Sequence, residues 1–197
     1  MMNVLITRQE SIFEKYLANA FIREGYNVIT ADTDVSVDCI DLYIDVSDER
    51  DEDDKFTVLE GMDEAIIKKV YEKNVLDPLK MFEKYLPFLD AGTGKRVCFL
   101  TSKEASINGT RDTNGYAYKL SKAAIHNFYQ MAMNRLSPGG YTIRIYDPMH
   151  GEIDAEASAE GAFNYFTRQR GSENNDPRRN DENRRVIRDA SGREHAW

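Results

Sequence analysis

The 197-residue sequence contains no apolar run approaching the roughly 20 residues of a membrane-spanning helix, so no span is expected. Its first residues, 1–7, lack a basic segment and a long apolar core, so no signal peptide is expected either. Basic residues are outnumbered, with 26 Lys and Arg against 34 Asp and Glu, and the formal net charge is -8. This balance argues against nucleic acid or an anionic membrane as a partner. We therefore expect a cytoplasmic protein.

Cysteine and histidine are scarce. The two cysteines, Cys39 and Cys98, make no disulfide framework, and both lie in strand-like runs where buried free thiols are expected. The three histidines, at positions 126, 150 and 195, are scattered without metal-ligand spacing. The sequence therefore predicts no metal site.

Hydrophobic residues make up 41% of the chain, enough at this length for a single domain, residues 1–197, with its own core. Strand-like and helical patterns alternate, which predicts an α/β fold. Strands are predicted at 4–7, 26–31, 39–45, 96–100, 141–146 and from 186 onward, and helices at 10–24, 61–89, 116–136 and 157–170. Pro78 is expected to bend or interrupt the second helix. The acidic run 48–54 is interpreted as a solvated loop, and the polar stretch 170–183 as a mobile one.

A hydroxyl-rich strand end and the helix that follows it carry the chemistry. Ser102 follows closely after the strand-like run 96–100, and open α/β sheets bind ligands at such strand ends. On the next helix Tyr118 and Lys122 are one turn apart on one face, where a cation favours the phenolate and lowers the tyrosine pKa. Together these groups could polarise a carbonyl and move a proton. The pair alone is also compatible with a half-buried tyrosine beside a solvated lysine.

These residues resemble the signature of the short-chain dehydrogenase/reductase family, a Tyr-x-x-x-Lys motif preceded by a serine at a strand end. The matching stretches are Thr101-Ser102, Ala105-Ser106-Ile107 and Tyr116 to Ala124, and they are similar to the C-factor-like branch. Asn74-Val75-Leu76-x-Pro78 resembles the family's Asn-Val-x-Gly-Pro, and the last residues, 186–197, look like that branch's final strand and terminal Trp.

The resemblance implies four roles. Tyr118 would be the acid/base, and Lys122 would lower its pKa and hold the nicotinamide ribose. Ser102 would orient the carbonyl oxygen, and Asn74 would complete the proton relay through a water. It also implies a three-layer α/β/α Rossmann fold with right-handed crossovers, and a homodimer or homotetramer. Because few residues separate Asp32 from the next strand, we expect a trimmed parallel sheet of about six strands, without the family's third strand.

The same resemblance implies a nicotinamide dinucleotide, but the glycine-rich turn that approaches its pyrophosphate is missing. Aligned on Thr7, the family's glycines fall on Arg8, Ile12 and Glu14, while Ser11 remains. Arg8 could pair with a phosphate. Glu10 and Glu14 suit an empty helix N-terminus and would repel a pyrophosphate there.

Three further positions are assigned to the cofactor. Asp32 corresponds to the acid that binds ribose hydroxyls in NAD-preferring members, so NAD is expected over NADP; a turn-forming aspartate explains it equally well. Val46 lies in Asp45-Val46-Ser47-Asp48, which replaces the family's Asn-Asn-Ala-Gly at the cofactor wall. Pro148 occupies the position of the Pro-Gly turn beside the nicotinamide.

Two functions follow. The first is an NAD(P)-dependent oxidoreductase that transfers a hydride between nicotinamide and a small carbonyl compound or secondary alcohol. The alternative is a degenerate family member that no longer binds dinucleotide and acts as a binding or regulatory scaffold. The sequence leaves the substrate and the direction of reaction open.

Overall fold

The first strand shows why the chain forms layers. In the computed structural model, which describes residues 1–31, 37–168 and 186–195, β1 (Asn3–Ile6) lies inside a sheet. Val4 and Ile6 belong to one buried apolar cluster and Leu5 to another. Successive side chains of a strand point to opposite faces, so each face of the sheet has its own core.

The described residues form a seven-stranded sheet in the order β2-β1-β3-β4-β5-β6-β7. The remaining strands are β2 (Asn27–Thr30), β3 (Leu42–Asp45), β4 (Arg96–Leu100), β5 (Thr142–Asp147), β6 (Ile187–Asp189) and β7 (Glu194–His195). The first six strands pair in parallel, which confirms the predicted fold class. The single C-terminal strand of the prediction is instead a hairpin, since β7 returns antiparallel to β6.

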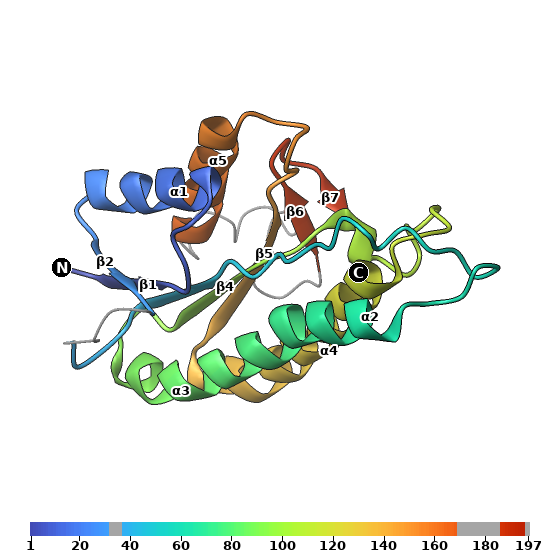
Figure 1. The fold of residues 1–197 in the computed structure, drawn as a ribbon. Coiled ribbons are helices and arrows are strands. Elements are labelled where there is room, and N and C mark those ends of the chain that lie inside the picture. Colours follow the sequence, from blue (N-terminus) through green and yellow to red (C-terminus); the bar gives the residue numbers. More distant parts are fainter. Residues whose placement is uncertain (32–36, 169–185, 196–197) are drawn as a thin grey trace.

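Helices cover both faces and complete three layers (Figure 1). Helices α1 (Ile12–Arg23) and α5 (Ala155–Thr167) lie on one side, where Phe21 meets Phe163 edge to face with ring centroids 4.9 Å apart. The other side carries α2 (Glu64–Tyr71), α3 (Asp77–Ala91) and α4 (Tyr116–Leu136). The buried ring of Tyr129 on α4 stacks on Phe99 of β4 at 3.7 Å.

The long helical pattern before β4 is interrupted differently from the prediction. It begins at Glu64, where the Asp63 carboxylate caps the amides of Ala65 and Ile66. Pro78 does not break it, because a π-helical turn, η1 (Glu72–Leu76), joins α2 to α3 and places Pro78 in the first turn of α3. A proline is tolerated there because the first amides of a helix have no intrahelical partner.

One sheet edge agrees with the trimmed sheet expected from the sequence. Within the described ranges β2 pairs only with β1 and so forms an edge.

Of the two cysteines, Cys98 is buried in β4, and burial raises the pKa of its thiol to about 12. Cys39 is only half-buried and precedes β3, so its predicted place in a strand was wrong. The predicted mobile loop, 170–183, lies outside the described residues.

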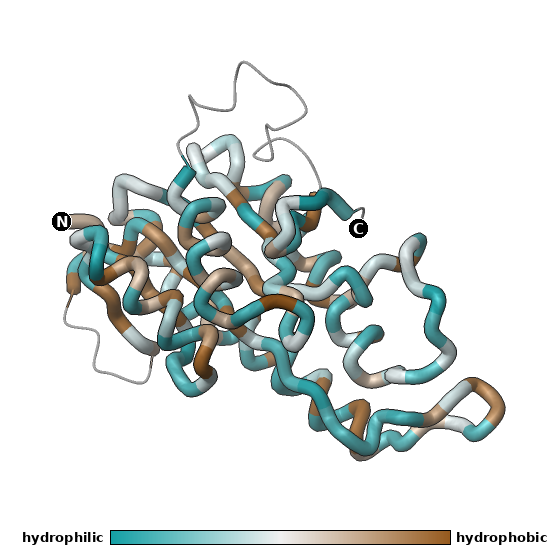
Figure 2. Tube along the Cα trace, turned by 90° about the horizontal axis from the view of Figure 1, so that it is seen from above, coloured by the Kyte–Doolittle hydropathy of each residue, from teal (hydrophilic) through white to brown (hydrophobic). Residues whose placement is uncertain are grey.

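The segment between β3 and α2 leaves the body of the molecule, and Figure 2 shows its apolar tip. Three of its apolar side chains are largely exposed, namely Val58, Leu59 and Met62. Where the chain is described, no helix combines the length and the apolar character needed to cross a bilayer.

Candidate functional site

The carboxyl ends of the parallel strands and the start of α4 meet at one edge of the sheet. Thr7 follows β1, Asp48 follows β3, Ser102 follows β4, and Asp147 ends β5. Helix α4 begins after Gly115, whose left-handed backbone (φ 76) turns the chain into the helix at a position that favours glycine. The strand ends thereby supply oxygen-bearing side chains opposite the first turns of α4.

Tyr118 and Lys122 lie on the buried face of α4, as their spacing predicts, with exposed fractions of 3% and 1%. Both reach the same atom of a third residue. The Tyr118 hydroxyl donates to Asp48 Oδ1 at 2.6 Å, and Lys122 Nζ lies 3.0 Å from that oxygen. Lys122 Nζ also donates to the carbonyl of Ser47 at 2.5 Å. A carboxylate therefore occupies the point on which the phenol and the ammonium converge.

This carboxylate reverses the expected electrostatics of the tyrosine. Burial, followed by the negative charge of Asp48, holds the pKa of Tyr118 well above its ordinary value. The sequence predicted a lowered pKa for Tyr118, and in this arrangement the pKa is raised instead. Burial alone would also raise the pKa of Asp48, but Lys122 and the Tyr118 hydrogen bond outweigh it, and the pKa of Asp48 lies below its usual value.

An arginine and a histidine also surround Asp48. The Arg50 guanidinium lies 3.7 Å from the centroid of the Tyr118 ring and pairs with Glu104 at 3.0 Å. His150 Nε2 lies 3.8 Å from Asp48 Oδ2. What remains open between β4, β5 and the Asp48 segment is a cavity of about 30 Å³. Its volume suits one or two water molecules and no larger ligand.

Ser102 lies where the sequence places it, at the end of β4, with 6% of its surface exposed. It lines the small cavity together with Asp48. Its Oγ accepts a hydrogen bond from the Glu104 amide at 3.2 Å and so caps the short 3-10 turn Lys103–Ala105. The hydroxyl thus faces the candidate site while it fixes the local turn.

Asn74, in the π-helical turn η1, is 1% exposed and binds a peptide group. Its Oδ1 accepts from the Glu49 amide at 2.7 Å, and its Nδ2 donates to the Glu49 carbonyl at 2.8 Å and to Ser121 Oγ at 3.0 Å. The structure therefore places Asn74 beside the neighbours of Asp48 and Lys122. Its hydrogen bonds hold the strand-end segment, whereas the sequence suggested a water relay.

The start of α1, where a dinucleotide pyrophosphate would lie, is closed by the chain itself. Glu14 is 3% exposed, and its Oε2 accepts from the amides of Glu10 at 2.6 Å and Ser11 at 2.8 Å. Ser11 Oγ accepts in return from the Glu14 amide at 3.2 Å, which makes a capping box. Arg8 pairs with Glu14 at 3.1 Å and does not stand free for a phosphate. Ile12 is 64% exposed.

The other predicted cofactor positions have structural partners. Thr7 Oγ1 accepts from the Val46 amide at 3.1 Å and donates to the buried Asp45 at 3.3 Å. The carbonyl of Pro148 accepts from Ser158 Oγ at 2.7 Å. Asp32 lies outside the described residues.

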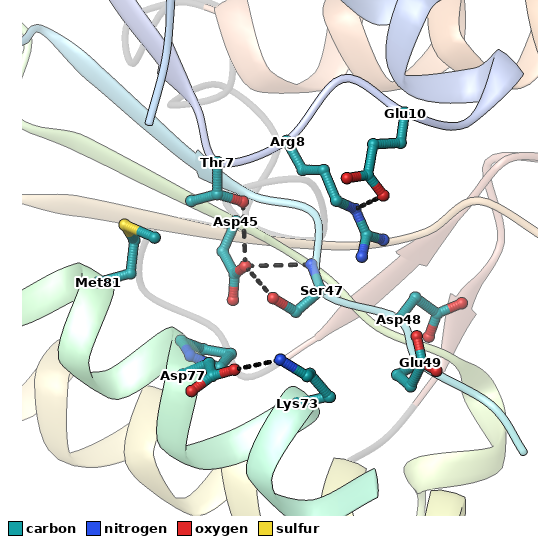
Figure 3. A pocket seen from close by; sticks show the side chains of 11 residues that line it. Thr7, Arg8, Glu10, Asp45, Ser47, Asp48, Glu49, Lys73, Asp77 and Met81 are labelled. Carbon is teal, nitrogen blue, oxygen red and sulfur yellow. Dashed lines mark hydrogen bonds and ion pairs between the residues drawn. The ribbon is translucent and has the colours of Figure 1, made fainter. Parts of the chain in front are cut away.

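An open pocket of about 240 Å³ adjoins the site between β1, β3 and α3 (Figure 3). Its charged lining is mainly acidic, with five carboxylates against two cations. The carboxylates belong to Glu10, Asp45, Asp48, Glu49 and Asp77, and the cations to Arg8 and Lys73. Burial raises the pKa of Asp45. The lining charge opposes a ligand that carries phosphates.

Sequence reasoning missed the two residues that shape the site most, Asp48 and Arg50. Both belong to the acidic run interpreted as solvated. It also left out His126, which follows Lys122 by one more helical turn and meets Thr101 at the end of β4. The i, i+4 spacing of Tyr118, Lys122 and His126 was a readable signal for this third residue. The resemblance placed Asp48 at the cofactor wall without a role of its own, and no spacing connects it to Tyr118.

Comparison with known proteins places this geometry in context. No family model matches the chain. The curated C-signal of Myxococcus xanthus is 31% identical over 90 residues, 46% of this chain and 54% of that protein. A 1-hydroxy-2-glutathionyl-2-methyl-3-butene dehydrogenase of Rhodococcus is 27% identical over 107 residues, 54% of this chain and 46% of that protein. The chain thus spans about half the length of these curated relatives.

Among solved structures, the carbonyl reductase Sniffer of Drosophila melanogaster superposes with a TM-score of 0.78 at 14% identity, covering 100% of both chains. A carbonyl reductase of Pseudomonas aeruginosa in complex with NADP gives 0.70 at 16% identity, again covering 100% of both chains. The chain therefore has a Rossmann-like fold. Fold and sequence likeness together confirm the resemblance to the short-chain dehydrogenase/reductase family.

Proposed function

We propose that this chain is an oxidoreductase of the short-chain dehydrogenase/reductase type that acts on a small carbonyl compound or secondary alcohol. The observation that carries the proposal is the convergence of Tyr118 and Lys122 on one oxygen atom at the carboxyl edge of the sheet. Asp48 Oδ1 marks a position where an oxygen acceptor lies within hydrogen-bonding reach of the phenol. A substrate carbonyl oxygen at that position would receive the Tyr118 proton.

The chain's own residues supply proton transfer and orientation. In the reducing direction Tyr118 donates its phenolic proton to the carbonyl oxygen. Lys122 stabilises the phenolate that remains. Ser102, on the wall of the adjoining cavity, orients the carbonyl oxygen. Asn74 acts through the segment that it holds, as a positioning residue.

A nicotinamide dinucleotide would supply the hydride, and the residues fit it at one end only. Tyr118 and Lys122 fit the reacting end, and the relatives of this fold include structures with NADP or a partially ordered NAD. At the phosphate end the amides of Glu10 and Ser11 are taken by Glu14, so a pyrophosphate does not fit there as the chain is arranged. We propose weak binding with NAD preferred over NADP, on the basis of Asp32 in the sequence.

The carboxylates of Glu14 and Asp48 favour a second function. Glu14 at the start of α1 and Asp48 beside Lys122 stand where a dinucleotide would place its phosphates and ribose. A chain that keeps them there permanently would be a binding or regulatory scaffold, the alternative expected from the sequence.

Titration of the protein with NADH and NADPH, followed by turnover of a panel of small aldehydes and ketones, tests the proposal. We expect weak NADH binding, a slow NADH-dependent reduction, and loss of that reduction in Tyr118→Phe. Tyr116→Phe is the control. It removes the phenolic hydroxyl of another tyrosine, two residues earlier on α4, and is expected to keep the activity. Binding of neither nucleotide at millimolar concentration would favour the scaffold, and full activity in Tyr118→Phe would remove Tyr118 from the mechanism.

A further inference from the structure

Asp48 has the contacts of a bound ligand, although it belongs to the chain. Its side chain is 10% exposed, and one of its oxygens satisfies both the Tyr118 hydroxyl and the Lys122 ammonium. The other oxygen faces His150 at 3.8 Å. The proposed reaction needs the Tyr118 hydroxyl and the Lys122 ammonium to be free. In this arrangement they are paired inside the protein.

The residues on both sides of Asp48 are anchored, so its position is fixed by more than its own contacts. On one side the Ser47 carbonyl accepts from Lys122 at 2.5 Å. On the other side Asn74 holds both the amide and the carbonyl of Glu49. Releasing these contacts costs free energy, because the buried Asn74 amide group would lose its bonds to the Glu49 peptide.

Arg50 holds the same segment against the ring of Tyr118. Its guanidinium stacks on the Tyr118 ring and is tied to Glu104, in the turn that Ser102 caps. With Asp48 beneath it, this contact narrows the space on the Ser102 side to the cavity of about 30 Å³. A carbonyl substrate and a nicotinamide ring do not fit into that volume together.

We propose that Asp48 is an autoinhibitory plug, an internal carboxylate that occupies the Tyr118–Lys122 pair and must leave before dinucleotide and substrate enter. This proposal rests on the proposed oxidoreductase function. The segment 47–50 forms the closed state, and its displacement exposes the phenol and the ammonium together. The closed state is favoured because the carboxylate neutralises the buried Lys122, which a neutral carbonyl substrate does not do. When Asp48 leaves, Lys122 loses its ion pair. A ligand that offers its own oxygens to Lys122 offsets this loss.

The test compares NADH affinity in the natural protein with that in two variants. Asp48→Asn keeps the shape of the side chain and removes its charge, and Asp48→Ala removes the group. We expect both to bind NADH more tightly by about tenfold or more, since a hydrogen bond to a charged group contributes at least such a factor. Glu52→Gln is the matched control, because it removes one charge from the same acidic run at an exposed position. Its affinity is expected to stay unchanged.

A second measurement reads the plug without any nucleotide. Labelling tyrosine at the ring carbon that bears the hydroxyl allows NMR to follow the ionisation of Tyr118, which Tyr118→Phe assigns. Because the Asp48 carboxylate raises the pKa of Tyr118, Asp48→Asn should lower this pKa, whereas Glu52→Gln should leave it in place. The same spectra show whether each variant is folded.

The outcomes separate the plug from the function. Tighter NADH binding in both Asp48 variants, together with the lower Tyr118 pKa, supports the plug. Equal NADH affinity in the natural protein and the variants overturns the plug and leaves the oxidoreductase standing. An unchanged Tyr118 pKa in Asp48→Asn also overturns it. If the pKa falls but none of the proteins binds NADH, the oxidoreductase function fails, and the plug fails with it.

Discussion

Replacing Glu14 with alanine tests how strongly the chain closes the start of α1. The change removes a carboxylate that is 3% exposed and that accepts from two backbone amides, at 2.6 and 2.8 Å. Each hydrogen bond to a charged group contributes about 1.5–3 kcal/mol, and water recovers part of this at a loop. The ion pair with Arg8 adds at most about 1 kcal/mol, since Arg8 is 35% exposed. We expect a loss of about 2–4 kcal/mol in the free energy of unfolding.

Thermal and urea unfolding followed by circular dichroism measure this loss. For a domain of this size the expected fall in melting temperature is about 5–15 °C. Glu10→Ala is the control, because the Glu10 carboxylate is 76% exposed and lies 3.8 Å from Arg8 Nε. It should cost less than about 0.5 kcal/mol. Glu14→Gln retains one acceptor oxygen and should fall between the two. Equal stabilities of Glu14→Ala and Glu10→Ala would refute a buried carboxylate at this helix start.

Two further predictions concern groups on α4. Lys122→Met should lower the free energy of unfolding by about 3–5 kcal/mol, because it leaves Asp48 without its ammonium partner. Adding Asp48→Asn should restore part of that loss. A cost below about 1 kcal/mol for Lys122→Met would contradict the pairing. Burial and then Lys122 lower the pKa of His126 to about 3, so the unfolded state takes up the proton first as pH falls. The stability that neutral His126 contributes is therefore complete above about pH 6.5 and declines toward pH 3, with a slope of up to about 1.4 kcal/mol per pH unit. His126→Gln should flatten the unfolding free energy between pH 6.5 and 5, and parallel curves for both proteins would speak against a buried neutral histidine.

The elements with strong local patterns were predictable from the sequence. β4 spans Arg96–Leu100, as its apolar run predicts, and α4 ends at Leu136, as expected. The capping box at Ser11 and Glu14 follows from a serine and a glutamate three positions apart at a helix start. Local signals of this kind reside in one stretch of chain, so no tertiary contact is needed to read them.

The electrostatics of the site were not predictable in the same way. Tyr118 and Asp48 are 70 residues apart in the chain, and no spacing rule connects a loop carboxylate to a helix at that distance. The acidic run 48–54 was interpreted as solvated because like charges ordinarily face water. Here Lys122 pairs with Asp48, Lys69 pairs with Asp51, and the amide of Tyr118 donates to Asp54. Only the folded chain brings these partners to the loop.

The π-helical turn η1 makes the helix around Asn74 sensitive to its exact length. A π turn holds one more residue than an α-helical turn, and such turns are frequent at functional sites. Deleting a single residue between 72 and 76 would let α2 and α3 merge into one regular helix. The side chains before and after the turn would then keep nearly the same directions, because only the extra residue of the wide turn is lost. Asn74 lies within the turn, so the deletion would displace the amide that binds the Glu49 peptide, while Pro78 would stay near the start of α3. For this reason a change in the number of residues here would disturb the site more than most single substitutions at the same positions.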